Sequence, residues 1–279
     1  MNLKSILVPT EQHDFMTSTL ETALLLARKF DSYIEGFALC PAMVELFALD
    51  PGGALPIEVK ENDAEIEKQA RSFFEAFMQD HGVARSASAD ASLSFGWLDG
   101  APNGDGFVGS YGRVFDITVL GRPDDRRSRP SMAAIEAGIF ETGRPILIAP
   151  PSAPKTIGEN ILIAWNCSTE QARTTALAMP LLHKAKRVVV LTVEGGTVPG
   201  PSGEQLATYL LRDGVRCEAI TMKSGNRSPG EVALAQAASL GSDLLVKGAY
   251  TQSRLRQMIF GGQTRHILAN ATLPVLMSH

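Results

Sequence analysis

The stretch SDLLVKGAY, residues 242–250, decides the fold, because its pattern occurs twice in the chain. An aspartate precedes a mostly apolar run that ends in a glycine, and FDITVLGRP at residues 115–123 has the same form. The alignment pairs Asp116 with Asp243 and Gly121 with Gly248. Apolar runs of this kind are typical of strands buried on both faces of a parallel sheet. The repetition therefore predicts two related domains.

Two further pairs of segments extend this repeat towards the ends of both halves. KSILVPT (4–10) is similar to ENILIAW (159–165), and GRPILIAP (143–150) is similar to TLPVLMSH (272–279). Helical patterns lie between the apolar runs, an alternation that indicates a parallel sheet covered on both faces. The expected fold class is α/β, with two tandem doubly wound, Rossmann-like domains at residues 1–150 and 155–279. The Pro-rich stretch PPSAP (150–154) separates them.

The second half predicts a regular order of elements. In chain order they are strand 160–165, helix 168–185, strand 187–193, helix 203–213, strand 215–222, helix 228–240, strand 242–248, helix 262–270 and strand 273–278. The first half predicts the same order with a helical insertion at residues 41–80. Its helix, from about Glu58 to Asp80, has an apolar face with Ile66, Phe73, Phe74 and Phe77. Packing of that face on its own domain is favoured over partner binding.

Composition narrows the class of protein. A formal net charge of -4 does not favour nucleic-acid binding, which asks for a basic face. No apolar stretch approaches the roughly 20 residues of a membrane span, and the N-terminal apolar run is too short for a signal peptide. The 3 cysteines lack any C-x-x-C pair and the 5 histidines lack ligand spacing, so no metal site is expected. We expect a cytoplasmic protein that binds neither nucleic acid nor a membrane.

The loop after residue 248 is the candidate ligand site. Doubly wound sheets bind ligands beyond the carboxyl ends of their strands. Gly248 leaves room for close approach of a ligand, and Gly261 and Gly262 open a helix whose first N–H groups favour an anion. Thr264 adds a hydroxyl in that first turn. A phosphate cradle and an ordinary surface loop leading into a helix explain these residues about equally well.

The residues of this region resemble the universal stress protein family in its tandem two-domain form. The resemblance rests on ILVPT, on the repeat and on GAYTQSRLRQMIFGGQTRHILANATLPVLM (248–277), and it is stronger in residues 159–279. Nucleotide-binding members carry a glycine, two residues, a glycine, nine residues, a glycine and Ser or Thr. Here that pattern falls on Gly248, Thr251, Gly261 and Gly262, so two of its four positions are substituted.

The resemblance implies ATP or another adenine nucleotide in the second half. Asn166 takes the place of the family's adenosine-binding aspartate, and Val193 matches the position whose main chain contacts adenine. The implied site residues are Trp165, Asn166, Val193, Gly248, Thr251, Gly261, Gly262, Gln263 and Thr264. In the first half, Glu11 and Asp124 replace an aspartate and a glycine of the family pattern. We therefore expect that half to be a degenerate partner that does not bind a triphosphate.

Three hypotheses follow for function. The leading one is a stress-response protein that holds an adenine nucleotide and acts through protein partners, as a homodimer. The alternative is a nucleotide-free tandem scaffold that acts through dimer surfaces. The third is a hydrolase or transferase with an adenylate intermediate. The sequence contains no known catalytic motif for such an enzyme, although a protein that holds ATP could still hydrolyse it slowly. The resemblance also implies that strand 145–149 pairs with strand 274–278.

Overall fold

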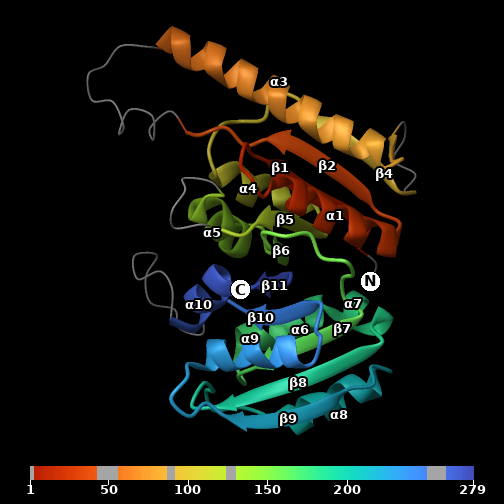
Figure 1. The fold of residues 1–279 in the computed structure, drawn as a ribbon, viewed down its shortest axis with the longest axis vertical. Helices are drawn as coiled ribbons and strands as arrows, with labels where there is room; N and C mark the ends of the chain where they lie inside the picture. The colour runs from red at the N-terminus through yellow and green to blue at the C-terminus, as the bar shows by residue number, and fades with distance from the viewer. Residues whose placement is uncertain (1–2, 43–55, 87–91, 124–129, 250–261) are drawn as a thin grey trace. The chain divides into compact units, whose positions relative to one another are not determined.

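The computed structural model describes residues 3–42, 56–86, 92–123, 130–249 and 262–279. Its contacts divide the chain into an N-terminal unit, Leu3–Arg144, and a C-terminal unit that includes Pro145–His279. Each unit contains a mostly parallel sheet with helices on both faces (Figure 1). The predicted fold class, α/β with doubly wound sheets, is confirmed.

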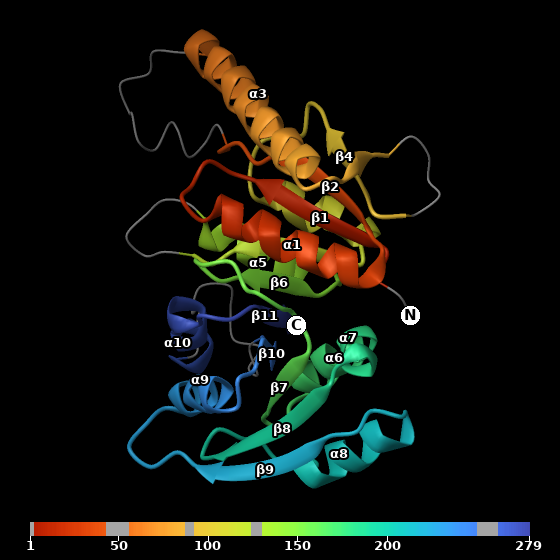
Figure 2. The same ribbon diagram turned by 45° about the vertical axis from the view of Figure 1, so that its right-hand side comes forward.

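The N-terminal unit has its strands in the spatial order β3-β4-β2-β1-β5, with every pair parallel. The strands are β1 (Ser5–Thr10), β2 (Tyr33–Ala38), β3 (Ala84–Arg85), β4 (Ser94–Leu98) and β5 (Ile117–Gly121). The helices are α1 (Met16–Phe30), α3 (Pro56–Asp80), α4 (Gly106–Tyr111), the 3-10 helix η1 (Gly112–Val114) and α5 (Met132–Glu141). Helices α1 and α3 lie on one face of the sheet, and α4 and α5 on the other (Figures 1 and 2).

The C-terminal unit has the order β6-β11-β10-β7-β8-β9. The strands are β6 (Ile146–Ala149), β7 (Asn160–Trp165), β8 (Arg187–Glu194), β9 (Glu218–Lys223), β10 (Leu244–Gly248) and β11 (Val275–Ser278). The helices are α6 (Thr169–Leu177), α7 (Met179–Lys184), α8 (Gly203–Arg212), α9 (Pro229–Ser239) and α10 (Gly262–Asn270). Helices α6 and α8 lie on one face, and α9 and α10 on the other (Figure 2).

Strand β6 belongs to the C-terminal unit, in which it pairs with β11. The pairing is antiparallel, with Leu147 opposite Leu276, and all other pairs of this sheet are parallel. It confirms the predicted association of strand 145–149 with strand 274–278. It also moves the contact boundary between the units to Arg144, ahead of the Pro-rich stretch.

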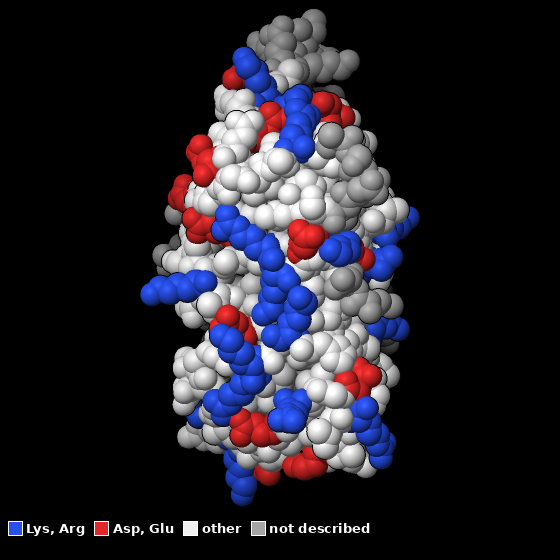
Figure 3. Space-filling view, turned by 90° about the vertical axis from the view of Figure 1, so that its right-hand side faces the viewer, with Lys and Arg blue, Asp and Glu red and all other residues white. Residues whose placement is uncertain are grey.

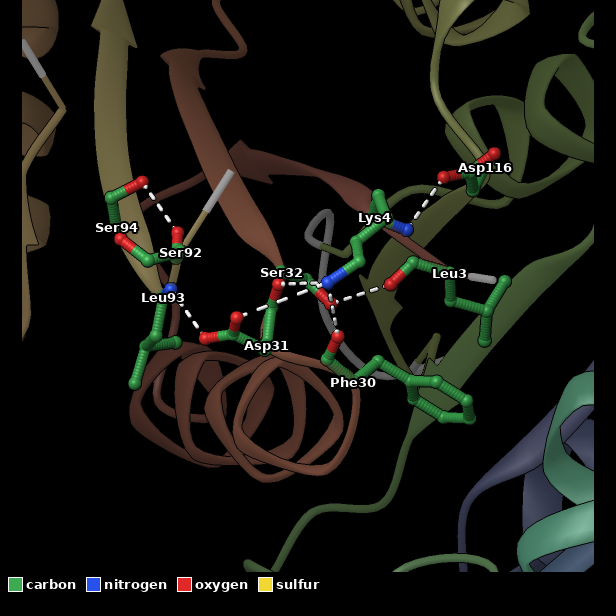
Figure 4. Close-up of polar contacts among 9 residues, drawn as sticks. All are labelled: Leu3, Lys4, Phe30, Asp31, Ser32, Ser92, Leu93, Ser94 and Asp116. Atoms are coloured by element: carbon green, nitrogen blue, oxygen red, sulfur yellow. Dashed lines mark hydrogen bonds and ion pairs between the residues drawn. The ribbon is translucent and has the colours of Figure 1, made fainter. Parts of the chain in front are cut away.

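The two halves repeat one strand order, β4-β2-β1-β5 in the first and β9-β8-β7-β10 in the second. An aspartate directly before the last strand of each order, β5 or β10, supports this repeat. The Asp116 carboxylate accepts hydrogen bonds from the main-chain N–H groups of Lys4 and Ser5 at 2.7 and 3.0 Å, the first of which Figure 4 draws. The Asp243 carboxylate likewise accepts from Glu159 and Asn160, each at 2.9 Å. The two aligned aspartates therefore occupy equivalent positions and make the same contacts in both halves.

Serines begin three helices of the C-terminal unit. The hydroxyls of Ser168, Ser202 and Ser228 each accept a hydrogen bond from the main-chain N–H three residues later. In α8 and α9 the side chain of the residue at that position, Gln205 or Glu231, accepts a hydrogen bond from the main-chain N–H of the N-cap serine. This second bond completes a capping box. These local signals explain why the predicted starts of α8 and α9 lie within one residue of the observed ones.

Some sequence predictions were wrong in detail. The helix predicted over 168–185 is two helices, α6 and α7, which meet at Ala178; Pro180 stands in the first turn of α7, where its missing N–H costs no hydrogen bond. On α3, Phe74 and Phe77 are buried as predicted, and Phe74 packs on Phe95 and Trp97 of β4. Phe73, however, is 42% exposed, so it is not part of that packed face.

Candidate functional site

A small pocket, partly open to solvent, lies at the carboxyl ends of β7, β8 and β10. This is the edge of a doubly wound sheet at which ligands bind. We call it the C-terminal pocket. Its lining residues are Ala164, Trp165, Asn166, Leu191, Val193, Gly196, Pro229, Gly230, Ala233, Lys247 and Ile267. Three predicted site residues, Trp165, Asn166 and Val193, are among them.

Local hydrogen bonds hold the segment that follows β7. The Trp165 indole N–H donates to the carbonyl oxygen of Pro201 at 2.8 Å, which fixes the ring at the pocket wall. The Asn166 side-chain oxygen accepts from the N–H of Ser168 at 3.2 Å. Between them Cys167 has a φ of 66°, a left-handed conformation that turns the chain from strand to helix. The main-chain N–H of Ser168 therefore orients the Asn166 side chain at the edge of the pocket.

Val193 lies at the end of β8 and lines the same pocket. Its carbonyl oxygen accepts a hydrogen bond from the N–H of Gly196 at 3.1 Å. This bond begins the turn that follows β8. Val193, Leu191, Ala164 and Ile267 make the pocket largely apolar.

Gly248 does not line the pocket, because it lies against helix α6. Its main-chain N–H donates to the Gln171 side-chain oxygen at 2.6 Å. A Cβ at this position would lie 2.5 Å from the main-chain nitrogen of Gln171. Close packing of strand on helix thus accounts for the glycine and occupies its N–H. A ligand contact at Gly248 stays a prediction.

The remaining predicted residues fall at or beyond the limit of the described chain. Thr251 and Gly261 lie outside the described residues. Gly262 and Gln263 begin helix α10, without described side chains, and Thr264 is buried in its first turn. Thr264 is not among the described residues that line the C-terminal pocket.

Lys247 is a pocket residue that sequence reasoning missed. It is the one charged residue of β10, its side chain lines the pocket, and the residue is 5% exposed. Burial lowers the pKa of its ammonium group to about 8, against a smaller raising effect of Glu170. A single lysine inside the apolar run LLVKG was the available signal.

In the N-terminal unit, neighbouring side chains crowd the corresponding strand ends. A Cβ on Gly121 would lie 2.8 Å from Pro130 and 3.1 Å from the His13 ring. Glu11, which follows β1, is also buried, and Asp124 lies outside the described residues. The expectation that this half is degenerate stays a prediction.

Three further features of the molecule bear on its chemistry. Among the described residues, no group of three or more His, Cys, Asp and Glu side chains could hold a metal ion. Within those same residues, no helix has the length and apolar character needed to cross a membrane. Lys and Arg are interspersed with Asp and Glu on the face shown in Figure 3, so this face does not present one sign of charge alone.

Comparisons with known proteins agree with this architecture. Residues 159–279 match the sequence profile of the universal stress protein family. A universal stress protein from Archaeoglobus fulgidus DSM 4304 has a similar structure, with a TM-score of 0.70 and 13% identity over 100% of this chain and 99% of that one. A comparison with curated protein sequences finds no significant match.

Two structures from Pseudomonas aeruginosa are also similar. One, from strain UCBPP-PA14 and assigned provisionally to the universal stress proteins, has a TM-score of 0.53 and 15% identity over 99% of this chain and 93% of that one. The other, a functionally unknown protein from strain PAO1, has a TM-score of 0.54 and 14% identity over 99% and 92%. At these identities the structural matches establish the fold of both halves, and the sequence profile shows that residues 159–279 form a universal stress protein domain.

Proposed function

We propose that this protein binds an adenine nucleotide, ATP or a close relative, in the C-terminal pocket and acts in a stress response through protein partners. The observation that carries the proposal is the position of the pocket. It lies where β7, β8 and β10 end, and three predicted nucleotide-binding residues line it. The same proposal makes the protein a cytoplasmic homodimer.

The apolar part of the lining supports a nucleobase as one part of the ligand. Leu191, Val193 and Ile267 offer an apolar surface for a flat ring, and the Trp165 ring closes one wall. The Asn166 amide can form hydrogen bonds with the polar edge of a base. The phosphates would then extend towards the start of α10, where helix N–H groups favour an anion.

Slow hydrolysis of a bound nucleotide is compatible with this proposal, but dedicated catalysis is not part of it. Burial raises the pKa of the Cys167 thiol beside the pocket, so this thiol stays protonated at neutral pH and is a poor nucleophile. The described residues also offer no acidic cluster for a catalytic metal. The protein would hold the nucleotide rather than consume it rapidly.

Two measurements test nucleotide binding. Mass spectrometry of small molecules released from the purified full-length protein identifies a bound ligand. Calorimetric titration with ATP then compares wild type with Ala233→Leu, which fills the pocket from α9, and with Ala207→Leu on α8, which does not line it. We expect Ala233→Leu to weaken ATP binding at least about tenfold, through steric exclusion, and Ala207→Leu to leave it unchanged. Binding that is absent in wild type would favour a nucleotide-free scaffold.

A further inference from the structure

The C-terminal pocket contains a buried positive charge at Lys247. The side chain extends from β10 to the face covered by α9 and α10, where Gly230, Ala233 and Ile267 also line the pocket. Gly248, the next residue, faces α6 on the opposite side, as the alternation of a strand requires. The lysine is therefore placed in the pocket by the register of β10.

The ammonium group keeps unused hydrogen-bonding capacity. Its Nζ donates to the carbonyl oxygen of Gly248 at 2.9 Å. A lysine ammonium has three donors, and the described part of the chain supplies Lys247 with one hydrogen bond and no ion pair. Glu170 of α6 is the carboxylate that acts on it electrostatically. At neutral pH a pKa of about 8 leaves the group mostly protonated.

The fold itself does not require a lysine at this position. In the repeat, Lys247 aligns with Leu120 of β5, because Gly248 aligns with Gly121. Leu120 is 3% exposed and carries no charge. An apolar side chain therefore suits the same position of the same sheet, whereas a buried and unpaired ammonium costs several kcal/mol of desolvation. A counter-ion from a ligand would offset that cost.

We propose that Lys247 is a binding residue of the C-terminal pocket, which meets an anionic oxygen of the ligand and makes the pocket select phosphorylated over neutral compounds. The inference rests on the proposed function and deepens it: the preferred ligand is a nucleotide rather than a nucleoside, and its phosphate, or an anion of the same chemistry, pairs with Nζ. Such charge-assisted bonds are about twice as strong as neutral ones.

Calorimetric titrations of the full-length protein with adenosine, AMP, ATP, ribose 5-phosphate and inorganic phosphate test this selection. The variants are Lys247→Met, which keeps the length of the side chain without its charge, and Lys223→Met at the exposed end of β9 as control. We expect wild type to bind AMP at least about tenfold more tightly than adenosine. Lys247→Met should lose that difference and keep the affinity for adenosine, and Lys223→Met should match wild type.

The outcomes separate the inference from the proposed function. Equal AMP affinities of wild type and a folded Lys247→Met variant would overturn the role of Lys247 and leave nucleotide binding intact. Binding of ribose 5-phosphate or phosphate that depends on Lys247, with no effect of the adenine base, would support the anion site and overturn the adenine assignment. A wild type that binds none of the five compounds would overturn both.

Discussion

The side-chain oxygen of Gln171 lies 2.6 Å from the main-chain nitrogen of Gly248 and accepts its hydrogen bond. Gln171 is fully buried in the first turns of α6, and its side-chain nitrogen also lies 3.5 Å from the carbonyl oxygen of Val246. One glutamine thus joins the helix to the last residues of β10. The glycine allows this close approach because a side chain would collide with the helix backbone.

Gly248→Ala should destabilise the protein through that collision. The new Cβ would lie 2.5 Å from the nitrogen and 2.7 Å from the Cα of Gln171, and neither main-chain atom can move without a shift of α6. We expect a loss of about 1–3 kcal/mol in the free energy of unfolding, measured by urea denaturation. Gly106→Ala is the matched control, since no heavy atom lies within 4 Å of its Cβ position. Equal stabilities of the two variants would contradict the packing role.

Lys247→Met should change the pH dependence of stability. The folded-state pKa of Lys247 is lowered by burial to about 8, from 10.5. Between these two values the unfolded chain binds a proton that the folded chain has released, so the free energy of unfolding of wild type rises with pH. The Met variant should lack this rise. Below pH 8 the Met variant should have a free energy of unfolding up to about 3 kcal/mol higher than that of wild type.

Urea denaturation of wild type and Lys247→Met at pH 7, 8, 9 and 10 measures this effect. The difference between the two proteins isolates Lys247, because all other groups titrate in both. Lys223→Met should follow the wild-type profile, since Lys223 is exposed. If the wild-type and Met profiles run parallel over this range, the ammonium is not desolvated as the structure indicates.

Glu35 should hold two tyrosines in their protonated form at high pH. Its carboxylate accepts hydrogen bonds from the hydroxyls of Tyr33 and Tyr111, each at 2.5 Å. Burial, and then these bonds to Glu35, raise the pKa of Tyr111 to about 12 and the pKa of Tyr33 further. Unfolded tyrosines ionise near pH 10, so the free energy of unfolding should fall as the pH rises above 10.

A spectroscopic titration of phenolate formation tests the role of Glu35. The chain has 4 tyrosines, and in wild type Tyr33 and Tyr111 should ionise above the normal range for a phenol. Glu35→Gln should bring their transitions closer to the normal range and lower the free energy of unfolding by about 1–3 kcal/mol at neutral pH. Tyr209→Phe, at an exposed tyrosine, is the control and should leave the transitions of Tyr33 and Tyr111 unchanged. An unchanged titration in Glu35→Gln would assign the shifts to burial alone.

Leu147 and Leu276 should be energetically coupled across the antiparallel pair of β6 and β11. They are directly opposite each other and buried. Each Leu→Ala change should cost about 2–5 kcal/mol, and the double variant should lose less than the sum by about 0.5–1 kcal/mol or more. Leu210 of α8, which packs on the β8–β9 end of the sheet, is the control partner for Leu276. Additive losses at 147 and 276 would contradict the pairing.

Much of the fold was predictable because its signals are local. The apolar run at 160–165 matches β7 residue for residue, and the serines before α8 and α9 mark the helix starts. The repeat also predicted the equivalence of Asp116 and Asp243, which the matching hydrogen bonds confirm. The break at Ala178 was missed because an apolar helical pattern continues through it. Pro180 was the sequence signal for a new helix start.

The candidate site was predictable only in part. Trp165, Asn166 and Val193 were found because the carboxyl ends of parallel strands meet at one edge of a sheet. Lys247 was missed because a lysine in an apolar run gives no indication of which face it occupies. Its neighbours in the pocket come from α9 and α10, which are remote in the sequence.

The sequence by itself determined most of the strands and helices, the repeat and the set of strand ends where a ligand would bind, since each is recognised from short local patterns of residues. Only the tertiary structure decided that Gly248 serves the packing of α6 and that Lys247 faces the pocket. Gln171 is 77 residues from Gly248 in the chain. The register of β10 and the helices packed on each face of the sheet decide that Gly248 meets a helix and Lys247 a cavity. Long-range packing sets both.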